Sequence, residues 1–218
     1  VGSEMCIRDS ASHFADVLAA ASANSNTNVA MLGESFKYAA PVAGSLGYSV
    51  EDTAIALGLM ASSGLKSSMA GSSLRTILTN LAKPTDDISD AMDYLGISLQ
   101  NGDGSMKSLM DIVTDLRGAF GQCKMPMDQF QENLAKLDEK YANGELTEKK
   151  YNEALADLTE KAYGAEGALK AKYAATLAGK EGMSGLLSIV SAAPEDFDKL
   201  TNAIYNSDGA AKEMAEIK

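Results

Sequence analysis

Apolar residues recur at the spacing of an α-helix along most of this 218-residue chain. A strand with one buried face would instead show alternation with a period of two. Two stripes show the helical spacing well, Phe14-Val17-Leu18-Ala21 and Leu74-Ile77-Leu78-Leu81. The sequence therefore predicts an all-α fold, a multi-helix bundle of short helices.

Turn and capping residues divide these stripes. Ser49 suits the N-cap of a helix with Asp52 at its third position, and Gly64 suits the left-handed residue that ends it. We expect Thr27 to cap the helix that begins after it and ends before Ser49. Pro41 should kink or break that helix, because proline lacks an N–H and clashes with the previous turn.

Residues 97–104 depart from this spacing. Ile97 and Leu99 alternate with polar residues, and Asn101-Gly102-Asp103-Gly104 is typical of a turn. We expect a short extended piece or hairpin arm here.

Residues 125–163 contain two charged helical segments, each with a narrow apolar seam. Asn143-Gly144 between them favours a turn, and Thr147 can cap the second segment. This pattern predicts a protruding antiparallel helical hairpin. Each arm is too short to be stable alone, so we expect it to pack on neighbouring helices or a partner chain. The seams consist of Phe130, Leu134, Leu137 and Tyr141, and of Tyr151, Leu155, Leu158 and Ala162.

We expect four segments along the chain. Residues 1–10 show no clear helical or strand period and no signal-peptide core, and they resemble translated adaptor scars of assembled metagenomic reading frames. We interpret them as a non-native or disordered leader, with an ordinary flexible N-terminus as the alternative. Residues 11–124 would form core helices, 125–163 a hairpin insertion, and 164–218 truncated C-terminal core helices, so that the whole is a piece of a longer protein.

Composition excludes several classes of protein. The net charge of −11 repels phosphate, so nucleic-acid binding is not expected. Cys6 and Cys123 are too few for a disulfide framework or a zinc cage. No apolar run is long enough to predict a membrane span.

Candidate catalytic residues are few. His13 is the single histidine, and we interpret it as an exposed residue at a helix start rather than a general base. Lys124 could modestly lower the pKa of the Cys123 thiol, but no second histidine is available as a base. We expect Cys123 to be a plain reduced cysteine, consistent with cytoplasmic synthesis.

Metal and phosphate motifs are incomplete. The pairs Glu51-Asp52 and Asp86-Asp87 follow Ser or Thr at helix starts, where they offset the helix dipole. The Asn101–Ser105 loop lacks an acidic calcium ligand at its twelfth position, which is Ile112. The glycines from Gly64 to Gly71 lack the Gly-Lys-Ser/Thr ending of a phosphate loop. We therefore assign no catalytic, cofactor-binding or metal residue.

A long ordered series of short motifs spans residues 34–84. It consists of Tyr38-Ala39-Ala40-Pro41-Val42-Ala43, Leu46-Gly47-Tyr48-Ser49, Glu51-Asp52-Thr53-Ala54, Gly64-Leu65-Lys66 with Gly71, Leu74-Arg75, Leu81-Ala82 and Pro84. This series resembles the core region of phage tail tape measure proteins of the lactococcal TP901-1 type. The resemblance covers roughly residues 11–120 and 165–215, and residues 125–163 depart from it.

The resemblance implies a structural role without catalysis or cofactor. Tape measure proteins are long helical chains that set tail length, nucleate tube polymerisation and leave the tube at DNA ejection. The implied partners are the tail tube protein, tail assembly chaperones, tail tip or baseplate proteins and further copies of the chain, with no specific nucleic acid. The implied location is the tube lumen of the virion tail, after assembly in the host bacterial cytoplasm. Membrane contact during ejection is left open.

A straight helix of this length would span on the order of 330 Å. The Gly and Pro breaks instead indicate a compact bundle, at least before assembly, so the ruler proper would lie in other sequence. Two alternatives remain open. The chain could be a generic helical adaptor or interaction module, or the non-catalytic part of a tape measure protein with a peptidoglycan hydrolase elsewhere.

Overall fold

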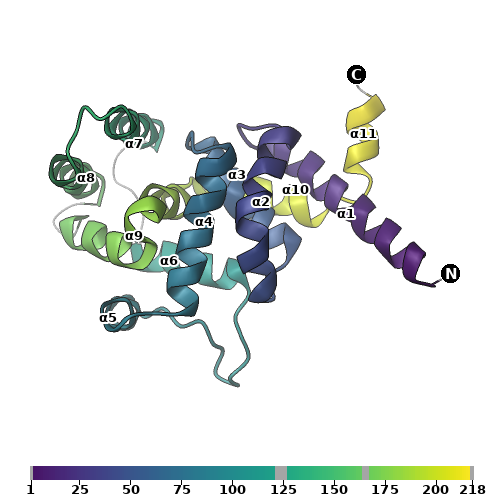
Figure 1. Cartoon of the computed structure of the whole chain (residues 1–218), viewed down its shortest axis with the longest axis horizontal. Coiled ribbons are helices and arrows are strands. Elements are labelled where there is room, and N and C mark those ends of the chain that lie inside the picture. Colours follow the sequence, from purple (N-terminus) through teal and green to yellow (C-terminus); the bar gives the residue numbers. More distant parts are fainter. Residues whose placement is uncertain (1, 121–126, 164–166, 217–218) are drawn as a thin grey trace.

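The computed structural model describes residues 2–120, 127–163 and 167–216, and these ranges contain α-helices and no strand (Figure 1). The predicted all-α fold is confirmed. The helices are α1 (Gly2–Asn24), α2 (Val29–Ser45), α3 (Val50–Ser62), α4 (Ser67–Ala82), α5 (Asp86–Leu95), α6 (Leu109–Phe120), α7 (Met127–Ala142), α8 (Glu148–Tyr163), α9 (Gly167–Ser191), α10 (Pro194–Tyr205) and α11 (Ala210–Glu216).

Helix α3 lies at the centre of the fold. Every residue from Asp52 to Ala61 is buried, and α1, α2, α4, α6, α9 and α10 all contact this helix. A helix with no solvent face must be apolar all round, and the run from Ala54 to Ala61 meets that requirement. One hydrophobic core therefore joins residues from both ends of the chain.

Small residues allow α4 to approach α2 on one side and α9 on the other. Gly71 of α4 packs against the backbone of Ser35 on α2, whose hydroxyl donates to the Ser67 carbonyl at 2.7 Å. On the other face of α4, the Ser73 hydroxyl donates to the Glu181 carbonyl at 2.7 Å. The three helices form a packed layer beside α3.

Helix α9 is kinked at Gly179, which has φ 66° and ψ 177°. A break of this kind leaves carbonyls of the preceding turn without helical donors. The side chain of Asn80 on α4 supplies one such donor to the Leu177 carbonyl at 3.1 Å. The kink divides α9 into two helical stretches, one on each side of Gly179.

Three helix boundaries differ from the expectations. Pro41, which was expected to kink or break its helix, does not break it, since α2 continues through it to Ser45. Pro41 and Lys37 are both exposed, so water can bind the Lys37 carbonyl that proline leaves unpaired. The cap of α2 is Asn28 rather than Thr27, and its side chain accepts from the Met31 N–H at 2.8 Å. Helix α1 begins at Gly2, within the segment interpreted as a leader, because adding residues to a formed helix gains one hydrogen bond each.

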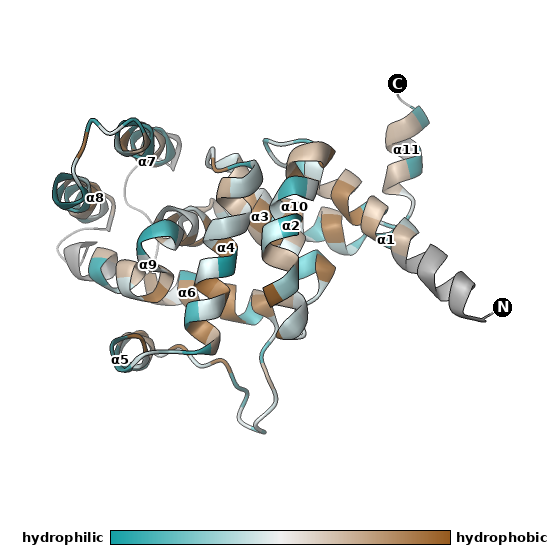
Figure 2. Ribbon diagram, viewed as in Figure 1, coloured by the Kyte–Doolittle hydropathy of each residue, from teal (hydrophilic) through white to brown (hydrophobic). Residues whose placement is uncertain are grey.

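Helices α7 and α8 are joined by residues 143–147 and pack together beside α9. Figure 2 shows that both carry many hydrophilic residues. Their seam residues Phe130, Leu134 and Leu155 are nevertheless fully buried. Residues 97–108 form a narrow loop with one antiparallel bridge between Gln100 and Met106, where a short extended piece was expected.

Ser49 caps α3 as predicted, and its hydroxyl accepts from the Asp52 N–H at 3.0 Å. We expect Ser49→Ala to lower the free energy of unfolding by about 1 kcal/mol, because one N–H at the start of the central helix loses its acceptor. Thr85→Ala is the matched control, since Thr85 occupies the N-cap of α5 without a side-chain cap bond. Urea unfolding of both variants measures the difference. Equal losses would contradict a role for the Ser49 hydroxyl.

Candidate functional site

The side chain of His13 links α1 to the start of α3 and to the loop before α11. Its Nε2 lies 2.7 Å from Glu51 Oε1, and its Nδ1 lies 3.7 Å from Asp208 Oδ1. His13 therefore lies in the interior of a helix beside a carboxylate, and the interpretation as a helix-start residue is wrong. The extension of α1 to Gly2 is the reason.

The hydrogen bond with Glu51 raises the pKa of His13 above its ordinary value of 6.5. Protonated His13 thus stabilises the fold fully below pH 6.5, and this contribution is lost as the pH rises through the folded-state pKa. His13 is the single histidine of the chain, so its NMR signal needs no assignment. We expect the imidazole signal to titrate above 6.5, and Glu51→Gln to lower its midpoint. Asp208→Asn should change it less, because the Asp208 side chain is 97% exposed. A midpoint unmoved by Glu51→Gln would contradict the pairing.

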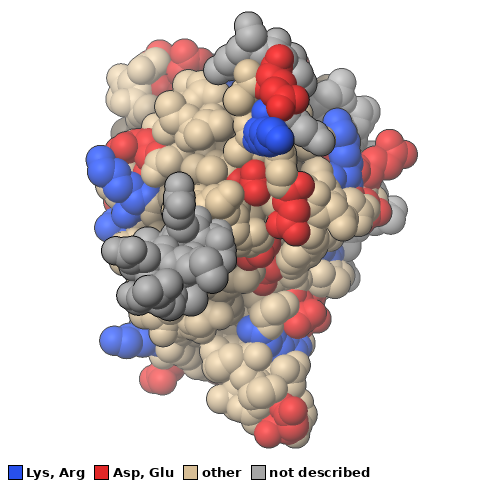
Figure 3. Space-filling view, turned by 90° about the vertical axis from the view of Figure 1, so that its right-hand side faces the viewer, with Lys and Arg blue, Asp and Glu red and all other residues tan. Residues whose placement is uncertain are grey.

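Two buried carboxylates attach the last helices to the core. Asp16 of α1 is 8% exposed and accepts from the Gly209 and Ala211 N–H groups at 3.0 and 2.9 Å, so it caps α11 from a distant part of the chain. Asp52 is 4% exposed and accepts from the Tyr205 hydroxyl and the Met110 N–H. Figure 3 views the end of the molecule at which α1 and α11 lie, with acidic side chains over the middle of the face.

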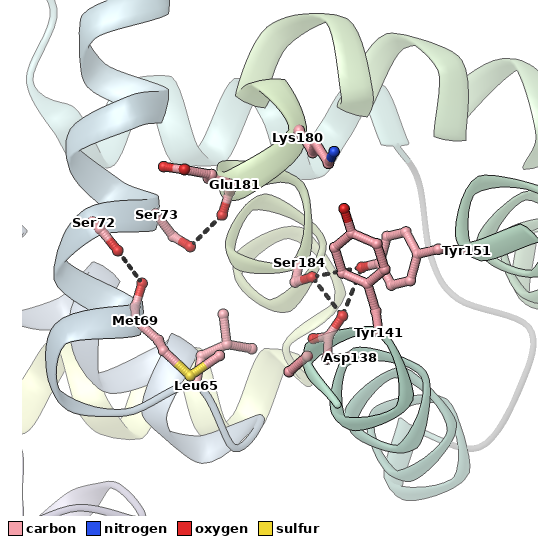
Figure 4. A pocket seen from close by; sticks show the side chains of 11 residues that line it. Leu65, Met69, Ser72, Ser73, Asp138, Tyr141, Tyr151, Lys180, Glu181 and Ser184 are labelled. Carbon is pink, nitrogen blue, oxygen red and sulfur yellow. Dashed lines mark hydrogen bonds between the residues drawn. The ribbon is translucent and has the colours of Figure 1, made fainter. Parts of the chain in front are cut away.

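A groove with a volume of about 620 Å³ lies between α4, α7, α8 and α9 (Figure 4). Asp138 Oδ1 accepts from the Tyr151 hydroxyl at 2.6 Å and from the Ser184 hydroxyl at 2.9 Å. Burial raises the pKa of the Asp138 carboxyl and that of the Tyr151 hydroxyl. The ring of Tyr141 lies 4.6 Å from that of Tyr151 between centroids. These residues hold α7 and α8 against α9.

The acidic pair Asp86-Asp87 and the turn at Asn101–Ser105 lie apart from the contacts of His13 and from the groove. Asp86 and Asp87 are exposed in the first turn of α5. This position agrees with their interpretation as charges that offset the helix dipole. In the Asn101–Ser105 loop, Asp103 Oδ1 accepts from the Ser105 N–H at 2.9 Å and from the Ser105 hydroxyl at 2.6 Å. The loop is thus a turn closed by its own side chains. Cys123 lies outside the described residues.

The sequence reasoning missed the groove residues and the role of Asp16. Asp138 lies four residues after Leu134 and three before Tyr141, within the apolar stripe of its helix. An acid within an apolar stripe is a signal that a buried partner exists. No local signal marks Asp16, whose partners lie at the other end of the chain.

The hydrogen bonds of His13, Asp16, Asp52 and Asp138 join helices to one another. In the described part of the chain, no group of three or more His, Cys, Asp or Glu residues could hold a metal ion. None of the described helices is both long and apolar enough to cross a membrane. The polar contacts of the described residues thus hold the helices of one all-α fold together.

This chain belongs to the phage-related minor tail protein family, whose model matches residues 4–137. It is 37% identical over 206 residues to the tape measure protein of Pneumococcus phage Dp-1, covering 94% of this chain and 14% of that relative. It is 25% identical over 210 residues to the probable tape measure protein of Escherichia phage P2, covering 96% of this chain and 21% of that relative.

These matches confirm the predicted resemblance to phage tail tape measure proteins, and they place the chain among the structural proteins of the phage tail. The chain spans only 14% and 21% of the length of the two curated relatives. No solved structure matches it.

Proposed function

We propose that this chain is a compact helical module of a tape measure protein that sets tail length and scaffolds tail tube assembly, and that the module itself performs no catalysis. The observation that carries the proposal is the 37% identity to a tape measure protein over 94% of the chain. The buried α3 and the close layer of α2, α4 and α9 support a folded module rather than a straight ruler segment.

The proposed partners are the tail tube protein, the tail assembly chaperones, the tail tip or baseplate proteins and further copies of the chain. The proposed location is the lumen of the tail tube, reached during assembly in the host cytoplasm. The net charge of −11 supports this placement, because an acidic protein does not bind the DNA that later passes through the tube. Any peptidoglycan hydrolase would lie elsewhere in the full-length protein.

An in-frame deletion of residues 11–216 from the full-length tape measure gene tests the proposal in the phage itself. We expect few tails, or tails of irregular length, because the scaffold for tube assembly is lost. The measurement is tail number and length by negative-stain electron microscopy. Abundant uniform tails shortened by on the order of 300 Å would contradict a compact module, because they would show a linear ruler segment. Unchanged tails would contradict any scaffolding or ruler role.

A further inference from the structure

The chain contains two asparagine-glycine pairs, and both lie on the surface. Asn101-Gly102 lies in the loop between α5 and α6, Asn143-Gly144 lies between α7 and α8, and all four residues are exposed. Asparagine is thermolabile because the backbone nitrogen of the next residue can attack its side-chain amide. Glycine crowds that nitrogen least, since it has no Cβ. Exposure does not distinguish the two pairs, so a difference in reactivity must come from their hydrogen bonds.

The nitrogen of Gly144 is engaged in the cap that ends α7. Its N–H donates to the Tyr141 carbonyl at 3.0 Å, and the Glu145 N–H donates to the Lys140 carbonyl at 2.9 Å. Gly144 has a φ of 74°, so these bonds form the left-handed cap that satisfies the last carbonyls of a helix. The Gly144 nitrogen therefore cannot attack Asn143 until this cap opens.

The nitrogen of Gly102 is not engaged in this way. The loop is closed by the Asn101 N–H, which donates to the Ser105 carbonyl at 2.8 Å, and by the Gly104 N–H, which donates to the Asn101 carbonyl at 3.0 Å. In the described part of the chain, the Gly102 N–H has no acceptor. The Asn101 side chain donates from Nδ2 to Ser105 Oγ at 3.0 Å, but this exposed bond holds the nitrogen that would leave and not the one that would attack. The loop thus keeps its shape without using the attacking atom.

We propose that Asn101 is a site of spontaneous deamidation, with water as the co-reactant, and that the cap of α7 protects Asn143 from the same reaction. The Gly102 nitrogen loses its proton and bonds to Asn101 Cγ, and the bond from Cγ to Nδ2 breaks as ammonia leaves. Water then adds to one carbonyl carbon of the resulting succinimide ring, and a C–N bond of the ring breaks. The product is aspartate or isoaspartate at position 101. The inference goes beyond the proposed function and does not depend on it.

Either product changes the loop where it is formed. Both lose the Nδ2 donor to Ser105, and both place a second carboxylate close to that of Asp103, which disfavours the turn. Isoaspartate also adds a carbon to the backbone within the loop that the Gln100–Met106 bridge closes. The charge and shape of this exposed loop would therefore change with time, without an enzyme.

Incubation of the whole chain in warm, mildly alkaline buffer tests the proposal, because base removes the amide proton. Mass spectrometry of proteolytic fragments measures the replacement of NH2 by OH at each asparagine. We expect Asn101 to convert about tenfold faster than Asn143, because the Gly144 nitrogen must first release its hydrogen bond. Unfolding in urea should make the two rates nearly equal. Equal rates in the folded chain would overturn the proposal, and so would an unchanged difference in urea, because the neighbouring sequence and not the cap would then set the rates.

Gly102→Ala tests the attacking atom. An added Cβ at this position meets nothing within 4 Å and the residue is not left-handed, so the fold should tolerate the change. We expect the methyl group to crowd the nitrogen and to slow the conversion of Asn101 about tenfold. Gly118→Ala, at another open position, should leave that rate unchanged. Circular dichroism checks that both variants fold, and an equal rate of Asn101 conversion in the two would overturn the proposal.

Discussion

Replacing Gly71 with alanine is expected to lower the free energy of unfolding by about 3 kcal/mol. An added Cβ would lie 2.2 Å from the Ser35 carbonyl oxygen, and that neighbour is backbone, which cannot rotate away. Helices α2 and α4 would have to separate, which also stretches the 2.7 Å hydrogen bond from the Ser35 hydroxyl to the Ser67 carbonyl. Chemical unfolding followed by circular dichroism measures the loss.

Gly118→Ala is the matched control for Gly71→Ala. Gly118 lies within α6, is exposed, and has nothing within 4 Å of the position of an added Cβ. We expect this variant to raise the free energy of unfolding by about 0.5–1 kcal/mol, because alanine loses less backbone entropy than glycine in a helix. Similar changes in the two variants would contradict the close crossing of α2 and α4.

Leu57→Ala is expected to lower the free energy of unfolding by about 3–5 kcal/mol. Leu57 is 0% exposed in the middle of α3, which six other helices contact, so the surrounding side chains cannot easily collapse into the cavity. The same unfolding measurement gives the loss, and the transition should remain cooperative.

Val50→Ala at the first position of α3 is the control for Leu57→Ala. Val50 is 36% exposed, so we expect a change within about 0.5 kcal/mol. A comparable loss at both positions would show that α3 is not the buried centre of the fold.

Local spacing predicted the helices well, because each apolar stripe lies within one element. The stripe from Leu74 to Leu81 is buried along α4, and the Ser49 cap and the left-handed Gly64 lie where they were expected. Such features depend on residues within three or four positions of one another. The same holds for the turn at Asn101–Ser105.

The contacts that join distant helices could not be predicted in this way. The cap of α11 by Asp16 and the bond between Tyr205 and Asp52 each join residues from opposite ends of the chain. Pro41 was expected to kink or break its helix, because the cost of a proline was judged without knowing that the residue is exposed. Burial and long-range pairing depend on how the helices pack, and the spacing of residues within one helix does not indicate that packing.

The polar cluster in the groove between α4, α7, α8 and α9 is another feature that local spacing could not predict. Tyr151 was predicted as an apolar seam residue, and Asp138 was assigned no role. Packing of α7 and α8 on α9 brings both side chains to Ser184, which makes one polar cluster from three elements. The acidic residue in the stripe was the only local sign of that cluster.

Small-angle X-ray scattering of the purified chain tests most directly whether this tape measure segment is a compact module. A compact chain of this length has a radius of gyration of about 17 Å, with a small increase because the start of α1 projects from the body (Figure 1). A continuous straight helix of the same length would give a radius of gyration of about 90 Å. We expect the smaller value at concentrations where the chain is monomeric, and a value near the larger one would contradict the compact fold.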